Sequence, residues 1–77
     1  MNDSDLALIE RLVPDNAELS HLLGKHQEYE GRLQVISRQK WRTPEEYVEE
    51  KKLKQLKLAG RDRMQDILAA HRKVASA

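Results

Sequence analysis

The segment Arg42–Glu46, with the sequence RTPEE, constrains the fold most because it marks where a helix must begin. Thr43 is a preferred helix cap, since its hydroxyl accepts a hydrogen bond from a backbone N–H of the first turn. Pro44 suits the first helical position, where its missing N–H costs nothing. Glu46 completes a capping box and, with Glu45, complements the positive end of the helix dipole. A helix is therefore expected from about residue 44 to about residue 74.

A second helix is expected before this start signal, from about residue 15 to residue 38. Its seam residues are spaced 3, 4, 3, 4 and 3 apart, which is the a/d pattern of a coiled coil. These seam residues are Leu19, Leu22, His26, Tyr29, Leu33 and Ile36. Only residues 39–43 separate the two helical segments, so we expect a turn there, centred on Trp41. The predicted fold is all-α: an antiparallel two-helix coiled-coil hairpin.

The expected C-terminal helix carries a matching line, Leu53, Leu56, Gly60, Met64 and Ile67, spaced 3, 4, 4 and 3. If the chain reverses at Trp41, residues whose numbers add up to about 82 face each other. Leu22 then faces Gly60, and His26 faces Leu56. Because a large side chain over a small one favours interdigitated packing, Gly60 is expected to let the facing helix approach closely.

A short helical segment is expected at the N-terminus, over about residues 4–12, with Asp3 or Ser4 as its cap. Pro14 interrupts it, because a proline disfavours the α conformation in the residue before it. Asp15 or Asn16 could start a new helix after a break, or Pro14 could produce only a kink. The sequence leaves both possibilities open.

Size and composition favour a single small domain over residues 1–77. The chain has 77 residues, of which 39% are hydrophobic and 35% charged, and no cysteine. The absence of cysteine excludes disulfides, thiolate zinc sites and thiol catalysis, and suits a reducing cytoplasm. No apolar run approaches the roughly 20 residues of a membrane span, and the acidic first residues argue against a signal peptide. Because so small a core supplies only about 3–5 kcal/mol, we expect association with another copy or with another protein to supplement it.

The chain resembles the YdcH-like small bacterial proteins of unknown function over roughly residues 12 to 70. The matching residues are Leu22–His26, Tyr29, Leu33, Thr43–Glu46, Glu49–Leu58 and Arg61–Met64. The resemblance implies a cytosolic bacterial protein with a two-helix antiparallel coiled-coil core. It implies no reaction. Gly60 stands where relatives tend to carry a better helix former.

No residue pattern in the chain indicates catalysis, a cofactor or a metal. His26 lies on the seam, where we expect its ring to pack while one nitrogen meets a carboxylate, the backbone or water. A metal site would need convergent partners such as His at i and i+4 with a carboxylate, which His21, His26 and His71 do not provide. The carboxylates of residues 45–50 complement a helix dipole and form no catalytic pair. We therefore expect a non-enzymatic protein that takes no small-molecule substrate.

Two surfaces could carry an interaction. Lys51, Lys54, Lys57, Leu58 and Arg61 fall on one stripe of the C-terminal helix, facing away from the seam. This stripe is either a solvated face or a site for an acidic protein or a phosphate backbone.

Trp41 is the second candidate. It could anchor a partner at the tip of the hairpin, although packing over the turn on Ile36 or Tyr47 is the preferred interpretation.

The predicted function is a cytoplasmic helical protein–protein interaction module that self-associates and presents helix faces to a partner, which is another protein or a second copy of the chain. Its candidate partner surface consists of Trp41, Lys54, Lys57, Leu58 and Arg61. The alternative is a nucleic-acid-associated protein that uses the basic stripe. The net charge of +1 and only three aromatic residues favour the first interpretation.

Overall fold

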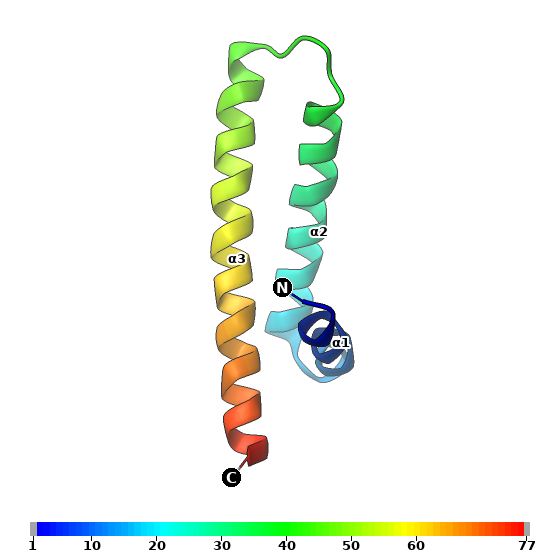
Figure 1. The fold of residues 1–77 in the computed structure, drawn as a ribbon, viewed down its shortest axis with the longest axis vertical. Coiled ribbons are helices and arrows are strands. Elements are labelled where there is room, and N and C mark those ends of the chain that lie inside the picture. Colours follow the sequence, from blue (N-terminus) through cyan, green and yellow to red (C-terminus); the bar gives the residue numbers. More distant parts are fainter. Residues whose placement is uncertain (1, 77) are drawn as a thin grey trace.

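A computed structural model describes residues 2–76 of the chain and, within that range, shows three α-helices and a short 3₁₀ turn (Figure 1). The elements are α1 (Asp3–Leu12), the 3₁₀ turn (Val13–Asp15), α2 (Ala17–Ser37) and α3 (Pro44–Ser76). The prediction of an all-α fold is confirmed. The molecule is elongated, with extents of 52 × 21 × 16 Å.

Helices α2 and α3 lie side by side and run in opposite directions (Figure 1). Three ion pairs join them: Glu18 to Arg63 at 2.8 Å, Glu30 to Lys57 at 3.1 Å, and Arg32 to Glu49 at 2.8 Å. As residue numbers rise along α2, the numbers of their partners on α3 fall. The last turn of α2 and the first turn of α3 therefore meet at the end of the molecule where residues 38–43 connect them.

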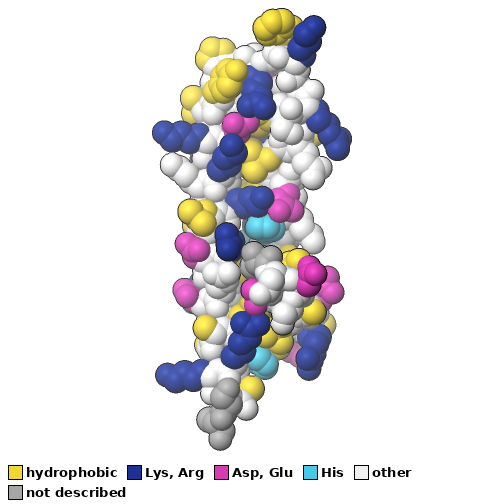
Figure 2. Space-filling model, viewed as in Figure 1, with side chains coloured by type: hydrophobic (Ala, Val, Ile, Leu, Met, Phe, Trp, Pro, Cys, Tyr) yellow, Lys and Arg dark blue, Asp and Glu magenta, His cyan; other side chains and the backbone are white. Residues whose placement is uncertain are grey.

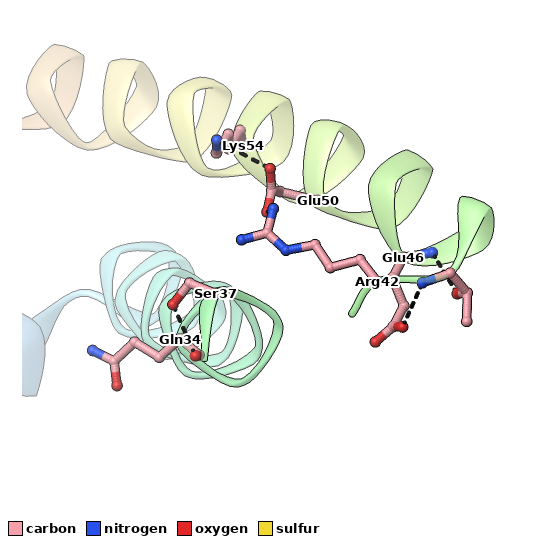
Figure 3. A network of polar contacts seen from close by, with 7 residues as sticks. Gln34, Ser37, Arg42, Glu46, Glu50 and Lys54 are labelled. Atoms are coloured by element: carbon pink, nitrogen blue, oxygen red, sulfur yellow. Dashed lines mark hydrogen bonds and ion pairs between the residues drawn. The ribbon is translucent and has the colours of Figure 1, made fainter. Parts of the chain in front are cut away.

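The start of α3 follows the predicted capping box (Figure 3). The backbone N–H of Glu46 donates to Thr43 Oγ1 at 3.2 Å, and the backbone N–H of Thr43 donates to Glu46 Oε1 at 3.0 Å. The second of these bonds holds the pKa of the Glu46 carboxyl below its ordinary value. Helix α3 accordingly begins at Pro44, where the sequence places it.

The N-terminal segment is a separate helix, because the chain breaks after α1. Asn2 caps α1 by accepting from the backbone N–H of Asp5 at 2.9 Å, so the predicted cap at Asp3 or Ser4 is wrong. The 3₁₀ turn contains Pro14, and Asn16 then caps α2 by accepting from the backbone N–H of Leu19 at 2.9 Å. In Figure 1 α1 is seen nearly end-on, so its axis crosses those of α2 and α3.

The core lies where α1 crosses the other two helices. Among the described residues, Ile9 of α1, Leu19 of α2, and Met64 and Leu68 of α3 are buried together in one cluster. Ile36 is buried apart from this cluster, close to the turn. The other seam residues of α2 (Leu22, His26, Tyr29 and Leu33) are half-buried, as are Leu53 and Ile67 of α3. Ile9 and Leu68 were not predicted as seam residues.

Half-buried and buried positions of α3 follow a heptad spacing through Glu46, Glu50, Leu53, Lys57, Gly60, Met64 and Ile67. The predicted line has Leu56 in place of Lys57, and it does not include Glu46, Glu50 or the buried Leu68. Leu56 is 38% exposed and borders the seam beside Leu22 and Tyr29. Lys57 meets Glu30 of α2 with its amine while its aliphatic stem lies along the seam.

The prediction that Gly60 lets the facing helix α2 approach α3 closely is wrong. A Cβ added at this glycine would meet no other atom within 4 Å. Gly60 instead borders a hollow of about 280 Å³, together with Leu22, Tyr29 and Leu56.

Candidate interaction surfaces

A half-buried polar cluster lies in the middle of the seam. Glu30 Oε1 lies 3.1 Å from Lys57 Nζ and 3.2 Å from His26 Nε2. The hydrogen bond from Lys57, together with the positive charge of Lys57, holds the pKa of the Glu30 carboxyl below its ordinary value against the opposing effect of burial. The His26 side chain is only 13% exposed, and its Nδ1 is buried without a hydrogen-bond partner.

This cluster agrees with one sequence prediction and corrects another. The ring of His26 packs between the helices with one nitrogen at a carboxylate, as predicted. Lys57 was assigned to the outward-facing basic stripe, and that assignment is wrong because the side chain turns towards α2. Sequence reasoning missed the Glu30–Lys57 pair, since its partners lie 27 residues apart and no local spacing links them.

A second polar cluster fastens the turn to α3 (Figure 3). Glu50 Oε2 accepts from Arg42 Nη1 at 2.7 Å, and Glu50 Oε1 lies 3.4 Å from Lys54 Nζ. The Arg42 guanidinium also lies 5.7 Å from the centre of the Tyr47 ring, within range of a cation–π contact. The side chains of Arg42 and Glu50 are largely buried, so this contact fixes the path of the turn onto α3.

Trp41 projects from the same end of the molecule and is 82% exposed. The preferred sequence interpretation, in which Trp41 packs over the turn on Ile36 or Tyr47, is wrong. Arg42 takes that place instead, through Glu50 and the ring of Tyr47. The only ring contact of Trp41 within the described residues is with Lys40, whose amine lies 5.9 Å from the ring centre. An exposed tryptophan beside a cation is typical of a partner anchor.

The rest of the basic stripe lies on the exposed side of α3. Lys54, Leu58 and Arg61 are exposed, with Leu58 at 55%, and they line a hollow of about 230 Å³ with Lys57 and Leu33. Figure 2 shows basic side chains distributed along this face, with acidic ones among them. Lys54 is paired with Glu50, whereas the structure records no ion pair between Arg61 and another described residue. The structure thus brings Lys54, Leu58 and Arg61 together, with Trp41 at a distance on the turn.

Neither a candidate metal site nor a candidate membrane-spanning helix occurs in the described part of the chain. Residues 2–76 contain no group of three or more His, Cys, Asp or Glu side chains placed to hold a metal ion. Within the same residues, no helix combines the length and the apolar character required to cross a bilayer.

Comparisons with protein-family models, with curated proteins and with solved structures find no match to this chain. The resemblance to the YdcH-like proteins therefore stays a prediction from the residues that carry it.

Proposed function

We propose that the chain is a non-enzymatic helical interaction module, an antiparallel coiled-coil hairpin that self-associates and binds a protein partner. The observation that supports this most is the exposure of Trp41 at 82%, in a molecule that fully buries only five side chains among its described residues. Tryptophan is the residue type most enriched among the side chains that dominate binding energy. Tyr47, Val48 and Leu58 are further large apolar side chains that face solvent on α3.

The alternative, nucleic-acid binding through the basic stripe, has less support. Lys54 and Lys57 are each within ion-pair distance of a carboxylate, Glu50 and Glu30 respectively. A phosphate backbone would therefore have to displace pairs within the protein, and the net charge of +1 provides little attraction at long range. Lys51 and Arg61 are the stripe residues left for it.

Capture of a protein partner from the native cell extract tests the main proposal. The tagged chain is compared with Trp41→Ala and Leu58→Asp, and with Val35→Asp as a control at an exposed apolar residue of α2. We expect a partner, identified by mass spectrometry, that Trp41→Ala or Leu58→Asp loses and Val35→Asp retains. Binding that Val35→Asp weakens equally would reflect non-specific adhesion and would contradict the proposal.

A salt series with double-stranded DNA and with RNA tests the alternative. Binding that weakens steeply with salt and is lost in the double variant Lys51→Glu, Arg61→Glu would favour a nucleic-acid-associated protein instead. Weak binding that is equal in this double variant and the unmodified chain would exclude it.

Spin labels test the hairpin itself. The chain has no cysteine, so Glu18→Cys with Arg63→Cys gives two unique labelling sites. We expect a short distance between them, because these residues form an ion pair at 2.8 Å. A single continuous helix would separate them by about 68 Å at 1.5 Å per residue, and that result would overturn the hairpin.

A further inference from the structure

A line of five exposed residues runs along the side of α3, each seven residues from the next. They are Glu45, Lys52, Ala59, Asp66 and Lys73. Seven residues are almost two helical turns, so such a line drifts by only about 20° per step and stays on one side of the helix. The first four members each precede a seam position by one residue (for example Ala59 before Gly60), which places the line about 100° around α3 from α2.

The charged members of this line differ from most other charges of the molecule in their surroundings. The structure records no ion pair between Glu45, Lys52, Asp66 or Lys73 and another described residue. Arg63 beside the line is paired with Glu18 at 2.8 Å, and the charge of Asp66 also acts on it. In Figure 2 acidic and basic side chains project from the edge of α3 that faces away from α2.

The order of charges along the line is self-complementary when one copy is turned end over end. Reversal about Ala59 places Lys52 opposite Asp66 of a second copy, and Glu45 opposite Lys73 of that copy. The two-fold relation repeats each contact, so four opposite-charge pairs flank a central meeting of two alanines. If the two copies were parallel and in register, each charged residue would instead meet the same residue of the other copy and be repelled. If the two-fold axis passed at Arg63 instead of Ala59, the two copies of Arg63 would face each other and repel.

The centre of the line also suits a close contact between helices. Ala59 and Gly60 are two small neighbouring residues in the middle of α3, and they border the hollow of about 280 Å³ that Leu22, Tyr29 and Leu56 also line. A helix that crosses at Ala59 would cover this hollow and the 38%-exposed Leu56 beside it. Apolar area and charge order therefore favour the same crossing point.

We propose that a second copy of this chain docks on this side of α3, antiparallel and centred on Ala59. The contacts are Lys52 with Asp66 of the partner copy and Glu45 with Lys73 of the partner copy. This inference rests on the self-association proposed above and specifies its surface. It is separate from Trp41 and from the stripe of Lys54, Leu58 and Arg61, which stay available to another protein.

Cysteine cross-linking tests the orientation, since the chain has no cysteine of its own. Ala59→Cys is expected to form a disulfide-linked dimer under mild oxidation, because the two-fold axis passes beside it. Lys52→Cys is expected not to link with itself, because the two copies of residue 52 lie about 21 Å apart along the helices. A mixture of Lys52→Cys and Asp66→Cys is expected to give a mixed dimer. Self-linking of Lys52→Cys as fast as Ala59→Cys would overturn the antiparallel arrangement.

Charge reversal tests the contacts by sedimentation equilibrium. Lys52→Glu turns two attractive pairs into repulsive ones and is expected to weaken the dimer by about tenfold, and adding Asp66→Lys is expected to restore it. Lys51→Glu, an exposed neighbour with the same change in net charge, is the control and is expected to leave the dimer nearly unchanged. All these side chains are exposed, and circular dichroism verifies that each variant is helical.

The remaining outcomes separate this inference from the proposed function. A dimer that Lys52→Glu and Lys51→Glu weaken equally, or that Ala59→Cys fails to link, would overturn this surface while self-association stands. A chain that stays monomeric at every concentration would overturn both the surface and self-association. The capture experiment with Trp41→Ala would then decide separately whether the chain binds another protein.

Discussion

At the scale of the residue, Lys57 shows what hydrophobic patterning leaves out. The pattern selects Leu56 for the seam because leucine is apolar and lysine is not. Lysine can nevertheless lie along a seam with its aliphatic stem while its amine reaches a carboxylate. That carboxylate, Glu30, lies on the facing helix at 3.1 Å, and only the packing of the two helices identifies it. With Lys57 included, the heptad spacing of α3 is continuous from Glu46 to Ile67.

Replacing Gly60 tests whether its lack of a side chain serves packing. Gly60→Ala is expected to raise the free energy of unfolding by about 0.5–1 kcal/mol, because glycine is a poor helix former and the added Cβ meets no atom within 4 Å. Urea unfolding of the variant and the unmodified chain measures the change.

Gly24 and Gly31 are matched controls for that experiment. Both lie inside α2, and a methyl group added at either position would also have open space around it. Gly24→Ala and Gly31→Ala are therefore expected to stabilise the chain by a similar amount. A loss of stability confined to Gly60→Ala would show that the space at this position is required for packing.

At the scale of the element, local sequence signals predicted the start of α3 more accurately than the starts of α1 and α2. Thr43, Pro44 and Glu46 provide several signals that agree, and α3 begins where they indicate. After Pro14, Asp15 and Asn16 are equally good capping residues, so the sequence alone does not decide which of them caps α2. The sequence also missed the cap at Asn2, since Asp3 and Ser4 beside it are equally good capping residues.

The two asparagine caps are expected to differ in importance. Asn16→Ala removes the acceptor for the backbone N–H of Leu19 and is expected to cost about 1 kcal/mol of stability, because Leu19 is buried in the core. Asn2→Ala removes the equivalent bond from the backbone N–H of Asp5 and is expected to cost less stability, because the exposed start of α1 can fray without exposing the core. Thermal unfolding followed by circular dichroism measures both. A larger loss for Asn2→Ala would contradict the placement of the core at the start of α2.

At the scale of the whole molecule, α1 determines where the core is, and sequence alone could not place it. The heptad spacing predicted that α2 and α3 have complementary apolar sides. It contains no information on a third helix that crosses both, so the packing of Ile9 against α2 and α3 and the burial of Leu68 were not predicted. The partner-surface residues were predicted from residue type and position along the expected helices, and only their exposure in the fold separates Leu58 and Trp41 from Lys57.

Ile9→Ala tests the contribution of this crossing. Truncation of a buried isoleucine costs about 2–5 kcal/mol, which is comparable with the whole stability of about 3–5 kcal/mol expected for so small a core. We expect the variant to be largely unfolded at room temperature, or folded only at high protein concentration. Leu6→Ala is the control, because Leu6 lies on the same helix but is exposed. Equal unfolding curves for Ile9→Ala and the unmodified chain would show that α1 does not contribute to the core.

Acid is expected to loosen the assembly of the three helices as a whole, because carboxylates pair α3 with both α1 and α2. Arg72 and Arg63 hold the pKa values of Asp5 and Glu18 below their ordinary 3.8 and 4.5, and Arg32 does the same for Glu49. A carboxyl whose pKa is lowered on folding contributes stability that is fully present above its ordinary pKa. This contribution is lost as the pH falls through the lowered value.

The free energy of unfolding is therefore expected to be constant between pH 7 and about pH 5 with respect to these groups, and to decrease from about pH 4.5 towards pH 2. Urea unfolding across this range measures the slope. Glu18→Gln removes the charge that pairs with Arg63 and is expected to reduce the slope, whereas Glu10→Gln, at an exposed residue with no recorded ion pair, is expected to leave it unchanged. Because these pairs are exposed to solvent, added salt should flatten the same dependence. Stability that rises on acidification would mean that the carboxylates are repelled rather than paired in the folded chain, and the arrangement of α1, α2 and α3 would then have to be different.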